Sequence, residues 1–381
     1  MKTFDIAFIG AGASALMCAS LVKNQSIALL ETSRSLAPKI RISGGGKCNF
    51  TNHDISEIHY LGDDQAIKKC FASFNQKDLL TFFQKQELAY EQRDHGKYFC
   101  KNSAMDIIKI FSRLTKHCDI FLDHTVDKVT HKDDFIIKTD KDTIRSKRLV
   151  VASGGLSYAS VGASDIGFKI AQSFGHALIK PQPALVGFTL QKDQFWMKSL
   201  SGISLPVSLR VGKKIFKDQL LLTHRGISGP AVLSGSLYWK KGTIIIDFLP
   251  EVRIRKLIVK KSDKQISSVF PLSKRFIKGY LKSVNLDDII IKHLTPQEID
   301  KLIKLHHYEL PLAGNFGYTK AEVTRGGVDT SEIDMSTFES LKKKDLYFIG
   351  EVLNVTGELG GYNFQWAFSS AKILADYLTK R

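Results

Sequence analysis

The segment from Phe4 to Glu31 constrains the fold more than any other part of this chain. A short apolar run, Ile6 to Ile9, leads directly into Gly10-Ala11-Gly12-Ala13-Ser14-Ala15, which has the form G-x-G-x-x-A. Apolar side chains then follow at helical spacing as far as Leu21, and a second apolar run ends at Glu31. This order predicts a strand, a glycine turn, a helix and a second strand.

The glycine turn has the chemistry of a dinucleotide-binding site. The first glycine allows the sharp bend, the second lets a pyrophosphate approach the backbone, and the helix N-terminus supplies N–H groups. Glu31 lies 21 positions after Gly10, where a carboxylate accepts hydrogen bonds from a ribose diol. NAD and FAD present the same adenosine diphosphate, so this motif leaves both open. The residues expected to contact the dinucleotide are Gly10, Gly12, Ala13, Ser14, Ala15 and Glu31.

Length and composition narrow the class of protein. A chain of 381 residues can form two or three domains, each with its own core. The apolar stretch at the N-terminus is interrupted by Asp5 and Gly10, which argues against a signal peptide or membrane anchor and predicts a cytoplasmic protein. The five cysteines form no C-x-x-C, which disfavours disulfide-reductase chemistry. Because His306 and His307 are adjacent and no H-E-x-x-H occurs, no metal site is expected.

The net charge of +17 allows two interpretations. Lysine and arginine are dense between Arg253 and Lys282, and such a basic segment can bind nucleic acid. Alternatively, these residues cover a solvated helix face, because Ile254, Leu257 and Ile258 are interleaved with them. We favour the solvated face. A nucleic-acid partner is then not expected, although the charge leaves it open, and the oligomeric state is not specified.

The order of predicted elements indicates an interrupted α/β domain. Residues 64–88 and 102–116 are expected to be helical, with Asn102 as the N-cap of the second region. Short alternating segments predict a β-rich insert at 186–250 and 309–318. Residues 251–308 form a predicted small helical subdomain, which contains the capping box Thr295-Pro296-Gln297-Glu298. The nucleotide-binding domain is then discontinuous, comprising 1–185 and 319–381.

A glycine-rich loop from Ser43 to Asn52 is a second candidate for ligand binding. Three consecutive glycines can lie flat against a ligand, with polar donors beside them. It is not a P-loop, because the required glycine and Ser/Thr are replaced by Arg41 and Cys48. A glycine turn without a ligand, and a purely structural thiol at Cys48, stay open. The residues expected to bind are Ser43, Gly44, Gly45, Gly46, Lys47, Cys48 and Asn49.

Two later segments end in small residues where a ligand would meet the sheet. The apolar run Leu149 to Ala152 enters Ser153-Gly154, as expected for a strand buried on both faces. The loop Gly357 to Asn363 precedes the last predicted helix, whose positive end favours the anionic form of a reduced flavin. A glycine-capped helix start without a ligand is the alternative. The residues expected to bind are Ala152, Ser153, Gly154, Gly350, Glu351, Gly360, Gly361, Tyr362 and Asn363.

Five segments spread over the whole chain together resemble a known flavoprotein family. They are the first glycine turn, 45–52, 223–230, 324–328 and 350–363. The chain resembles the BaiN-like or aminoacetone-oxidase-like NAD(P)/FAD-dependent oxidoreductases, which are related to the glutathione-reductase superfamily. The resemblance implies an α/β fold: a Rossmann-like FAD-binding domain of glutathione-reductase type, an inserted β-barrel-like domain and a small helical subdomain.

The resemblance also assigns roles to particular residues. It implies that Glu31 holds the adenosine ribose, that the Val126 backbone holds the adenine, and that Gly350-Glu351 lies along the ribityl and pyrophosphate. Position 47 is lysine where the family often has arginine, and Lys97 stands where arginine is expected, so bidentate contacts are lost there.

The resulting hypothesis is an FAD-dependent oxidoreductase. NAD(P)H or an organic donor would reduce the flavin, and a small organic substrate or oxygen would reoxidise it. No second G-x-G-x-x-G with a following acid is present, so NAD(P)H would bind transiently. Tyr362, His224 and Cys48 are weak candidates for a general acid. A flavoprotein that acts on tRNA or other RNA, and a non-catalytic redox sensor, are the alternatives.

One variant follows from this hypothesis. Because we expect Glu31 at an exposed strand end, Glu31→Ala should lose FAD while the protein stays folded.

Overall fold

The computed structural model describes residues 1–260 and 263–381 and divides the chain into two compact units. Unit 1 comprises Met1–Pro183 and Glu322–Arg381, and unit 2 comprises Ala184–Ala321. Each unit has its own hydrophobic core. The predicted helical subdomain is not separate, because it shares a core with the barrel: the rings of Phe248 and Phe276 lie 5.0 Å apart.

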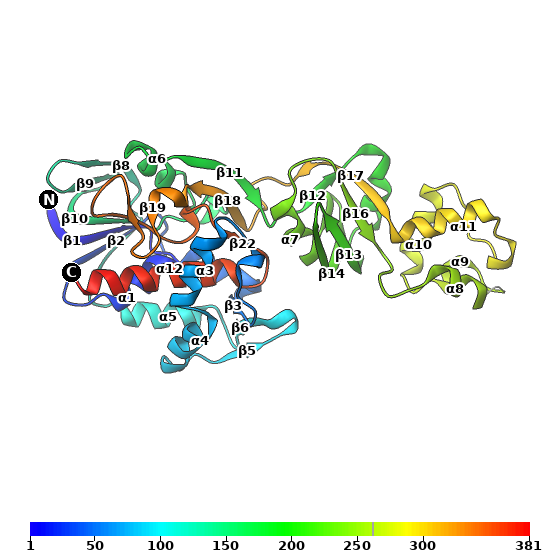
Figure 1. The fold of residues 1–381 in the computed structure, drawn as a ribbon, viewed down its shortest axis with the longest axis horizontal. Helices are drawn as coiled ribbons and strands as arrows, with labels where there is room; N and C mark the ends of the chain where they lie inside the picture. Colours follow the sequence, from blue (N-terminus) through cyan, green and yellow to red (C-terminus); the bar gives the residue numbers. More distant parts are fainter. Residues whose placement is uncertain (261–262) are drawn as a thin grey trace. The chain divides into compact units, whose positions relative to one another are not determined.

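Unit 1 is built on a nine-stranded sheet whose central strands run parallel (Figure 1). Antiparallel strands extend it on one side only, because the opposite edge strand is parallel to its neighbour. The path is β19 (Ile333–Asp334), β20 (Glu339–Ser340), β21 (Leu346–Phe348), β10 (Thr143–Val151), β1 (Lys2–Ile9), β2 (Ile27–Glu31) and β7 (Asp119–Leu122); β9 (Phe135–Thr139) pairs with β10 and with β8 (Val126–His131).

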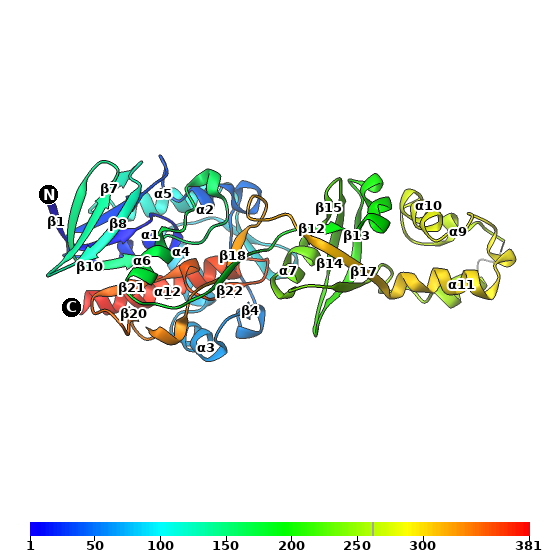
Figure 2. The same cartoon turned by 90° about the horizontal axis from the view of Figure 1, so that it is seen from above.

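The helix that follows the first glycine turn lies between two others. Helix α1 (Ala13–Leu21) contacts both α12 (Tyr362–Thr379) and α5 (Met105–Leu114), and α6 (Ile166–Ser173) contacts β8 (Figure 2). The order β1, glycine turn, α1 and β2 confirms the strand, turn, helix and strand predicted for this segment. The predicted cap at Asn102 is wrong: α5 begins three residues later, and the Ser103 hydroxyl accepts a hydrogen bond from the Met105 N–H.

Helix α12 is buried on nearly all sides rather than along one apolar stripe. Its apolar residues Ala367, Phe368, Ala371, Leu374, Ala375 and Leu378 are buried, but Gln365, Ser369 and Ser370 are buried as well. Their polar atoms are satisfied: the Ser369 hydroxyl, for example, donates to the Phe74 carbonyl oxygen at 2.8 Å. An interior helix can carry such residues because each buried polar group has a partner.

The remaining elements of unit 1 surround the ends of the parallel strands. They are α2 (Pro38–Ile42), the 3-10 turn η1 (Ser43–Gly46), the three-stranded sheet of β3 (Asn49–Asn52), β6 (Lys97–Cys100) and β5 (Tyr90–Gln92), helices α3 (Asp64–Ser73) and α4 (Gln76–Lys85), the pair β4 (Tyr60–Leu61) and β22 (Thr356–Gly357), and the pair β11 (Leu178–Ala184) and β18 (Val323–Val328).

Unit 2 contains a closed six-stranded barrel, and helices are inserted between its strands along the chain. Side chains alternate along the strands, as in β13, so that one set fills the barrel. The predicted capping box of α11 is confirmed. The barrel order is β12 (Phe188–Leu190), β15 (Gly226–Ser228), β14 (Lys214–Thr223), β13 (Ser204–Val211), β16 (Thr243–Asp247) and β17 (Tyr308–Asn315), and the helices are η5 (Lys192–Leu200), α7 (Pro230–Tyr238), α8 (Ile254–Lys260), α9 (Ile266–Val269), α10 (Lys274–Ser283) and α11 (Pro296–Ile303).

The described residues form neither a membrane-spanning helix nor a cluster of metal ligands. No helix in 1–260 or 263–381 is long and apolar enough to cross a bilayer. Nor do three His, Cys, Asp or Glu side chains of these residues gather in a group that could hold a metal ion.

Candidate functional site

The two glycines of the first turn have different surroundings: a side chain at Gly10 would clash with the protein, whereas one at Gly12 would not. Gly10 has φ +100°, and a Cβ atom there would lie 2.7 Å from the Ala152 carbonyl oxygen, closer than such atoms pack. At Gly12 a Cβ would meet no described atom within 4 Å. Gly10 therefore makes the bend, whereas Gly12 leaves open space in front of the α1 N-terminus, where an anionic group is favoured.

Glu31 ends β2 as a buried carboxylate. Its Oε2 accepts from the Ala11 N–H at 2.9 Å, and its Oε1 accepts from the Ser33 N–H at 2.8 Å. Burial raises the pKa of Glu31, and the two backbone donors counteract part of that rise. The side chain is 8% exposed, so the expectation of an exposed strand end is wrong. Two carboxylate oxygens retain lone pairs for a diol.

Two segments lie beside Glu31 that the glycine motif does not indicate. The His124 N–H donates to the Glu31 carbonyl oxygen at 3.0 Å, two residues before Val126. A Cβ at Gly162 would lie 3.5 Å from Glu31 Oε1, so the turn of Tyr158 to Gly162 lies against the carboxylate. Tyr158 itself has φ +67°, which is uncommon for a residue other than glycine.

The segment after β10 joins the first turn to the C-terminal loop. The Ser153 hydroxyl is buried and has no hydrogen-bond partner among the described residues. A Cβ at Gly154 would lie 3.8 Å from Glu351 Oε2, and one at Gly155 would clash with Thr324 at 2.6 Å. A Cβ at Gly167 would lie 2.1 Å from this hydroxyl, so the Ser153 side chain packs against α6 and not against the open space at Gly12.

The glycine loop 43–49 has an open backbone on one side. Gly44, Gly45 and Gly46 all have positive φ, and a Cβ at Gly45 or Gly46 would meet no described atom within 4 Å. The other side is fixed, since the Ala104 N–H donates to the Gly46 carbonyl oxygen at 2.8 Å. The Asn49 side chain donates to the Tyr98 carbonyl oxygen at 2.9 Å, so it positions the loop.

Loops that are far apart in sequence meet at β3. The Asn52 amide donates to the Gly360 carbonyl oxygen at 2.9 Å, and the Thr51 hydroxyl donates to Gln365 Oε1 at 2.6 Å. A Cβ at Gly361, whose φ is +94°, would lie 2.4 Å from the Thr51 carbonyl oxygen. The structure thus brings together β3, which directly follows the glycine loop, and the N-terminus of α12.

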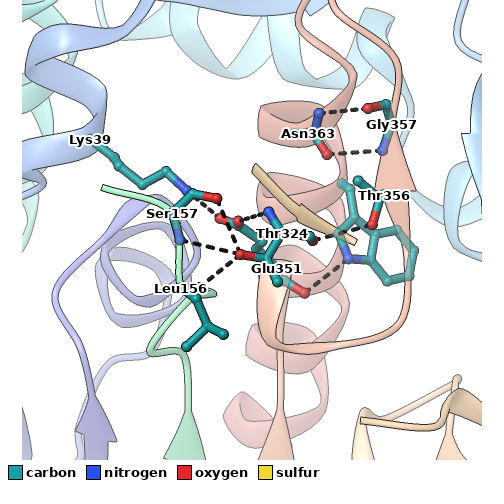
Figure 3. A network of polar contacts seen from close by, with 10 residues as sticks. Lys39, Leu156, Ser157, Thr324, Glu351, Thr356, Gly357 and Asn363 are labelled. Atoms are coloured by element: carbon teal, nitrogen blue, oxygen red, sulfur yellow. Dashed lines mark hydrogen bonds and ion pairs between the residues drawn. The ribbon is translucent and has the colours of Figure 1, made fainter. Parts of the chain in front are cut away.

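Glu351 is the centre of a polar network (Figure 3). Its Oε2 accepts from Lys39 Nζ at 2.5 Å, and its Oε1 accepts from the Thr324 N–H at 2.9 Å. The Thr324 hydroxyl accepts from the Leu156 and Ser157 N–H groups. In the same view the Asn363 side chain makes two hydrogen bonds with the Gly357 backbone, each 2.9 Å long. The network fixes Glu351 and the loop before α12.

His59 is a feature of this region that sequence reasoning missed. Its ring lies 4.7 Å from the Tyr362 ring in a stacked arrangement. Nδ1 lies 3.1 Å from Glu358 Oε2, and Nε2 lies 3.2 Å from Asp54 Oδ2. Burial lowers the pKa of His59, but the two carboxylates outweigh this, so the pKa is raised. No local motif marks this histidine, because its partners come from distant segments.

The three weak general-acid candidates have different surroundings. The Cys48 thiol is fully buried, and burial raises its pKa, so the reactive thiolate is disfavoured. Burial also raises the pKa of Tyr362, whose side chain is 6% exposed. His224 is exposed in unit 2 between β14 and β15. The structure does not bring these three side chains together within one unit.

Comparison with known proteins decides the family. The HI0933-like protein Rossmann domain matches residues 4–377. The chain belongs to the HI0933-like family. One relative, named ribosomal RNA dihydrouridine synthase, from Haemophilus influenzae, is 38% identical over 95% of each chain. Another, named 3-dehydro-bile acid delta(4,6)-reductase, from Clostridium scindens, is 27% identical over 96% of each chain.

The solved structures agree on the fold. A 3-ketosteroid-delta4-(5alpha)-dehydrogenase from Rhodococcus jostii has a TM-score of 0.53 and 11% sequence identity, covering 98% of this chain and 97% of that one. The fold of this HI0933-like protein is the Rossmann-type FAD-binding fold with a closed six-stranded barrel, as predicted. It belongs to a family of flavoprotein oxidoreductases.

The residues of unit 1 fit an FAD molecule. The open space at Gly12 and the carboxylate of Glu31 provide an anion site and a diol acceptor. The open glycines of loop 43–49 and the α12 N-terminus are the groups that would border the flavin ring. These features belong to one unit and one core.

Proposed function

We propose that this protein is an FAD-dependent reductase that converts uridine in ribosomal RNA to dihydrouridine. The observation that supports this proposal is the 38% identity to a ribosomal RNA dihydrouridine synthase over 95% of both chains. Identity of this extent includes the barrel and the helices of unit 2 as well as the nucleotide turn. We therefore prefer the hypothesis that the substrate is RNA, which the sequence left open, to the hypothesis that it is a small organic molecule.

In this proposal the protein binds and orients the groups that react. Bound FAD, once reduced by NAD(P)H, would supply a hydride to the carbon–carbon double bond of the base, and a proton from solvent or an acidic group would complete the addition. Gly12 and the α1 N-terminus hold the pyrophosphate, and Glu31 holds the adenosine ribose. Lys39 Nζ lies 2.5 Å from Glu351 Oε2 and holds in place the carboxylate that would contact the ribityl chain. The peptide groups around Gly360 and Gly361 would stabilise negative charge on a reduced flavin.

NAD(P)H is the proposed electron donor. The chain has no second dinucleotide fingerprint, so the nicotinamide would bind transiently. Anaerobic addition of NADH or NADPH to the purified yellow protein should bleach the flavin absorbance. A non-catalytic redox sensor predicts no bleaching by either donor.

The decisive test is a reconstitution with RNA. Ribosomal RNA from a strain that lacks the gene is incubated with the FAD-loaded protein and NADPH or NADH, digested to nucleosides and analysed by mass spectrometry. Dihydrouridine should appear only with enzyme and donor together. If the flavin is bleached and reoxidised but uridine stays unchanged, the RNA substrate is wrong.

A small-molecule reductase is the second candidate. It is supported by the 27% identity to a 3-dehydro-bile acid delta(4,6)-reductase over 96% of both chains. Turnover of an unsaturated 3-oxo steroid by the FAD-loaded protein, with no dihydrouridine in RNA, would favour this candidate.

A further inference from the structure

Unit 2 carries most of the net positive charge of the molecule, +13 of +17. Residues 184–321 contain 23 Lys and Arg against 10 Asp and Glu, a net charge of +13. The rest of the chain contains 32 against 28, a net charge of +4. Such an asymmetry attracts a polyanion to one unit rather than to the whole surface.

Within unit 2, α10 has a buried face and a basic face. Phe276, Ile277, Tyr280 and Leu281 are buried, whereas Lys274, Arg275, Lys278 and Lys282 are exposed. The three lysines are four residues apart, so they form one line with a rise of about 6 Å per step.

Helix α10 packs closely on the 3-10 helix η5, which continues this surface. A Cβ at Gly279 would lie 2.9 Å from the Leu200 side chain, so glycine permits the approach. The Arg275 guanidinium donates to the Ser199 carbonyl oxygen at 2.7 Å. We call one set of residues of the two elements the η5–α10 surface: Phe195, Lys198, Lys274, Arg275, Lys278 and Lys282. All are exposed except Lys198, which is half-buried.

An exposed aromatic ring distinguishes this surface from an ordinary solvated helix. Phe195 is 43% exposed, and Lys198 Nζ lies 3.4 Å from its ring centroid. Aromatic rings beside basic groups are the elements with which proteins bind unpaired nucleotides, by stacking on bases and pairing with phosphates.

The nearby carboxylates do not cancel this charge. Asp288 lies 4.0 Å from Lys278, and the Asp193 side chain accepts from Gln194. Among the described residues, neither Lys274 nor Lys282 takes part in an ion pair. The surface therefore keeps an excess of cations beside an accessible ring.

We propose that the η5–α10 surface binds a single-stranded or looped segment of RNA. The lysines contact phosphates and Phe195 stacks on a base. Paired bases in a duplex are not accessible to such a ring, so a duplex would lose the stacking part. This proposal rests on the proposed function and specifies which part of the protein engages the RNA.

The test compares two charge-matched variants of the full-length, FAD-loaded protein. Lys274→Gln/Lys282→Gln alters the surface, and Lys128→Gln/Lys138→Gln alters a cross-strand pair of exposed lysines in unit 1. Binding to single-stranded RNA is measured over a range of salt concentrations. Two lost phosphate contacts should make the slope of log K against log salt shallower by about 1.4 in the first variant only.

Phe195→Leu is the complementary variant. It should weaken RNA binding roughly fivefold or more with little change in salt slope, because stacking is lost and charge is kept. Unchanged flavin absorbance and unfolding temperature show that each variant is folded.

Each outcome has a defined meaning. If the unit 1 control loses RNA affinity as much as Lys274→Gln/Lys282→Gln, or if neither does, the surface is wrong while the proposed function stands. If binding depends on the surface but no dihydrouridine forms with wild-type protein, the proposed function fails and the surface stands. If the surface variants instead lose binding only to vesicles of anionic lipid, the surface serves a membrane and the RNA proposal is overturned.

Discussion

Glu31 makes hydrogen bonds within the protein in addition to its proposed contact with the FAD ribose. Its carboxylate accepts hydrogen bonds from the Ala11 and Ser33 N–H groups, and the side chain is buried. Removing it leaves two donors without a partner, which costs about 1–3 kcal/mol for each buried group. Glu31→Ala therefore changes both the stability of the fold and the proposed contact with FAD.

Glu31→Gln separates these effects. The amide keeps one acceptor oxygen but loses the charge that strengthens hydrogen bonds from a ribose, worth about 1.5–3 kcal/mol. FAD affinity should fall by roughly tenfold or more, with a smaller drop in apoprotein unfolding temperature than Glu31→Ala shows. Fluorescence titration with FAD measures the affinity, and wild-type affinity in Glu31→Gln would contradict the assignment.

His59 makes the stability depend on pH. Its pKa is raised above the ordinary value of about 6.5 by Glu358 and Asp54 despite burial. The stabilisation is fully present below that value and is lost as the pH rises through the raised pKa. Wild-type protein should exceed His59→Gln in unfolding free energy at pH 6, and the difference should shrink at pH 9. Urea unfolding at both pH values measures this, and a constant difference would refute the ion pairs.

At the scale of elements, the two glycines of the first turn predict opposite phenotypes. Gly10→Ala places a Cβ 2.7 Å from the Ala152 carbonyl oxygen at φ +100°, so the apoprotein should lose stability by about 1–3 kcal/mol. Gly12→Ala meets open space. Its apoprotein should unfold at the wild-type temperature but bind FAD more weakly. Calorimetry without FAD and titration with FAD check the pair, and equal apoprotein stability of the two variants would contradict it.

Sequence patterns were sufficient to predict those elements that are determined by residues close together in the sequence. The strand, turn and helix around Gly10 follow from apolar spacing and glycine, and the capping box at Thr295 follows from four adjacent residues. Tertiary contacts decided the rest. Ser103 replaces Asn102 at the start of α5, and Ser369 lies inside the core because Phe74 offers a carbonyl oxygen. The site at His59 could not be predicted either, because its partner Glu358 and the Tyr362 ring come from a distant part of the sequence.

The whole molecule consists of two units with separate cores. FAD binding should therefore stabilise unit 1 and not unit 2. Phe276 is fully buried in the core of unit 2. Phe276→Ala should destabilise unit 2 by about 3–5 kcal/mol. Flavin occupancy should stay near that of wild type, because every residue in the FAD assignment belongs to unit 1.

Calorimetry with and without FAD checks this prediction, with Phe8→Ala as the matched core variant of unit 1. The transition lowered by Phe276→Ala should not shift with FAD, whereas the one lowered by Phe8→Ala should. A single transition that moves in both variants would show that the units unfold together.

The contact between Asn52 and Gly360 joins positions 308 residues apart. During translation the segment that contains Asn52 is synthesised early, whereas its partner, the Gly360 carbonyl group, is synthesised 308 residues later. Residues 184–321 leave the exit tunnel in the interval and can fold first. The cofactor pocket is thus completed late in synthesis, and a nascent chain stalled before residue 360 would hold a finished barrel but no binding site.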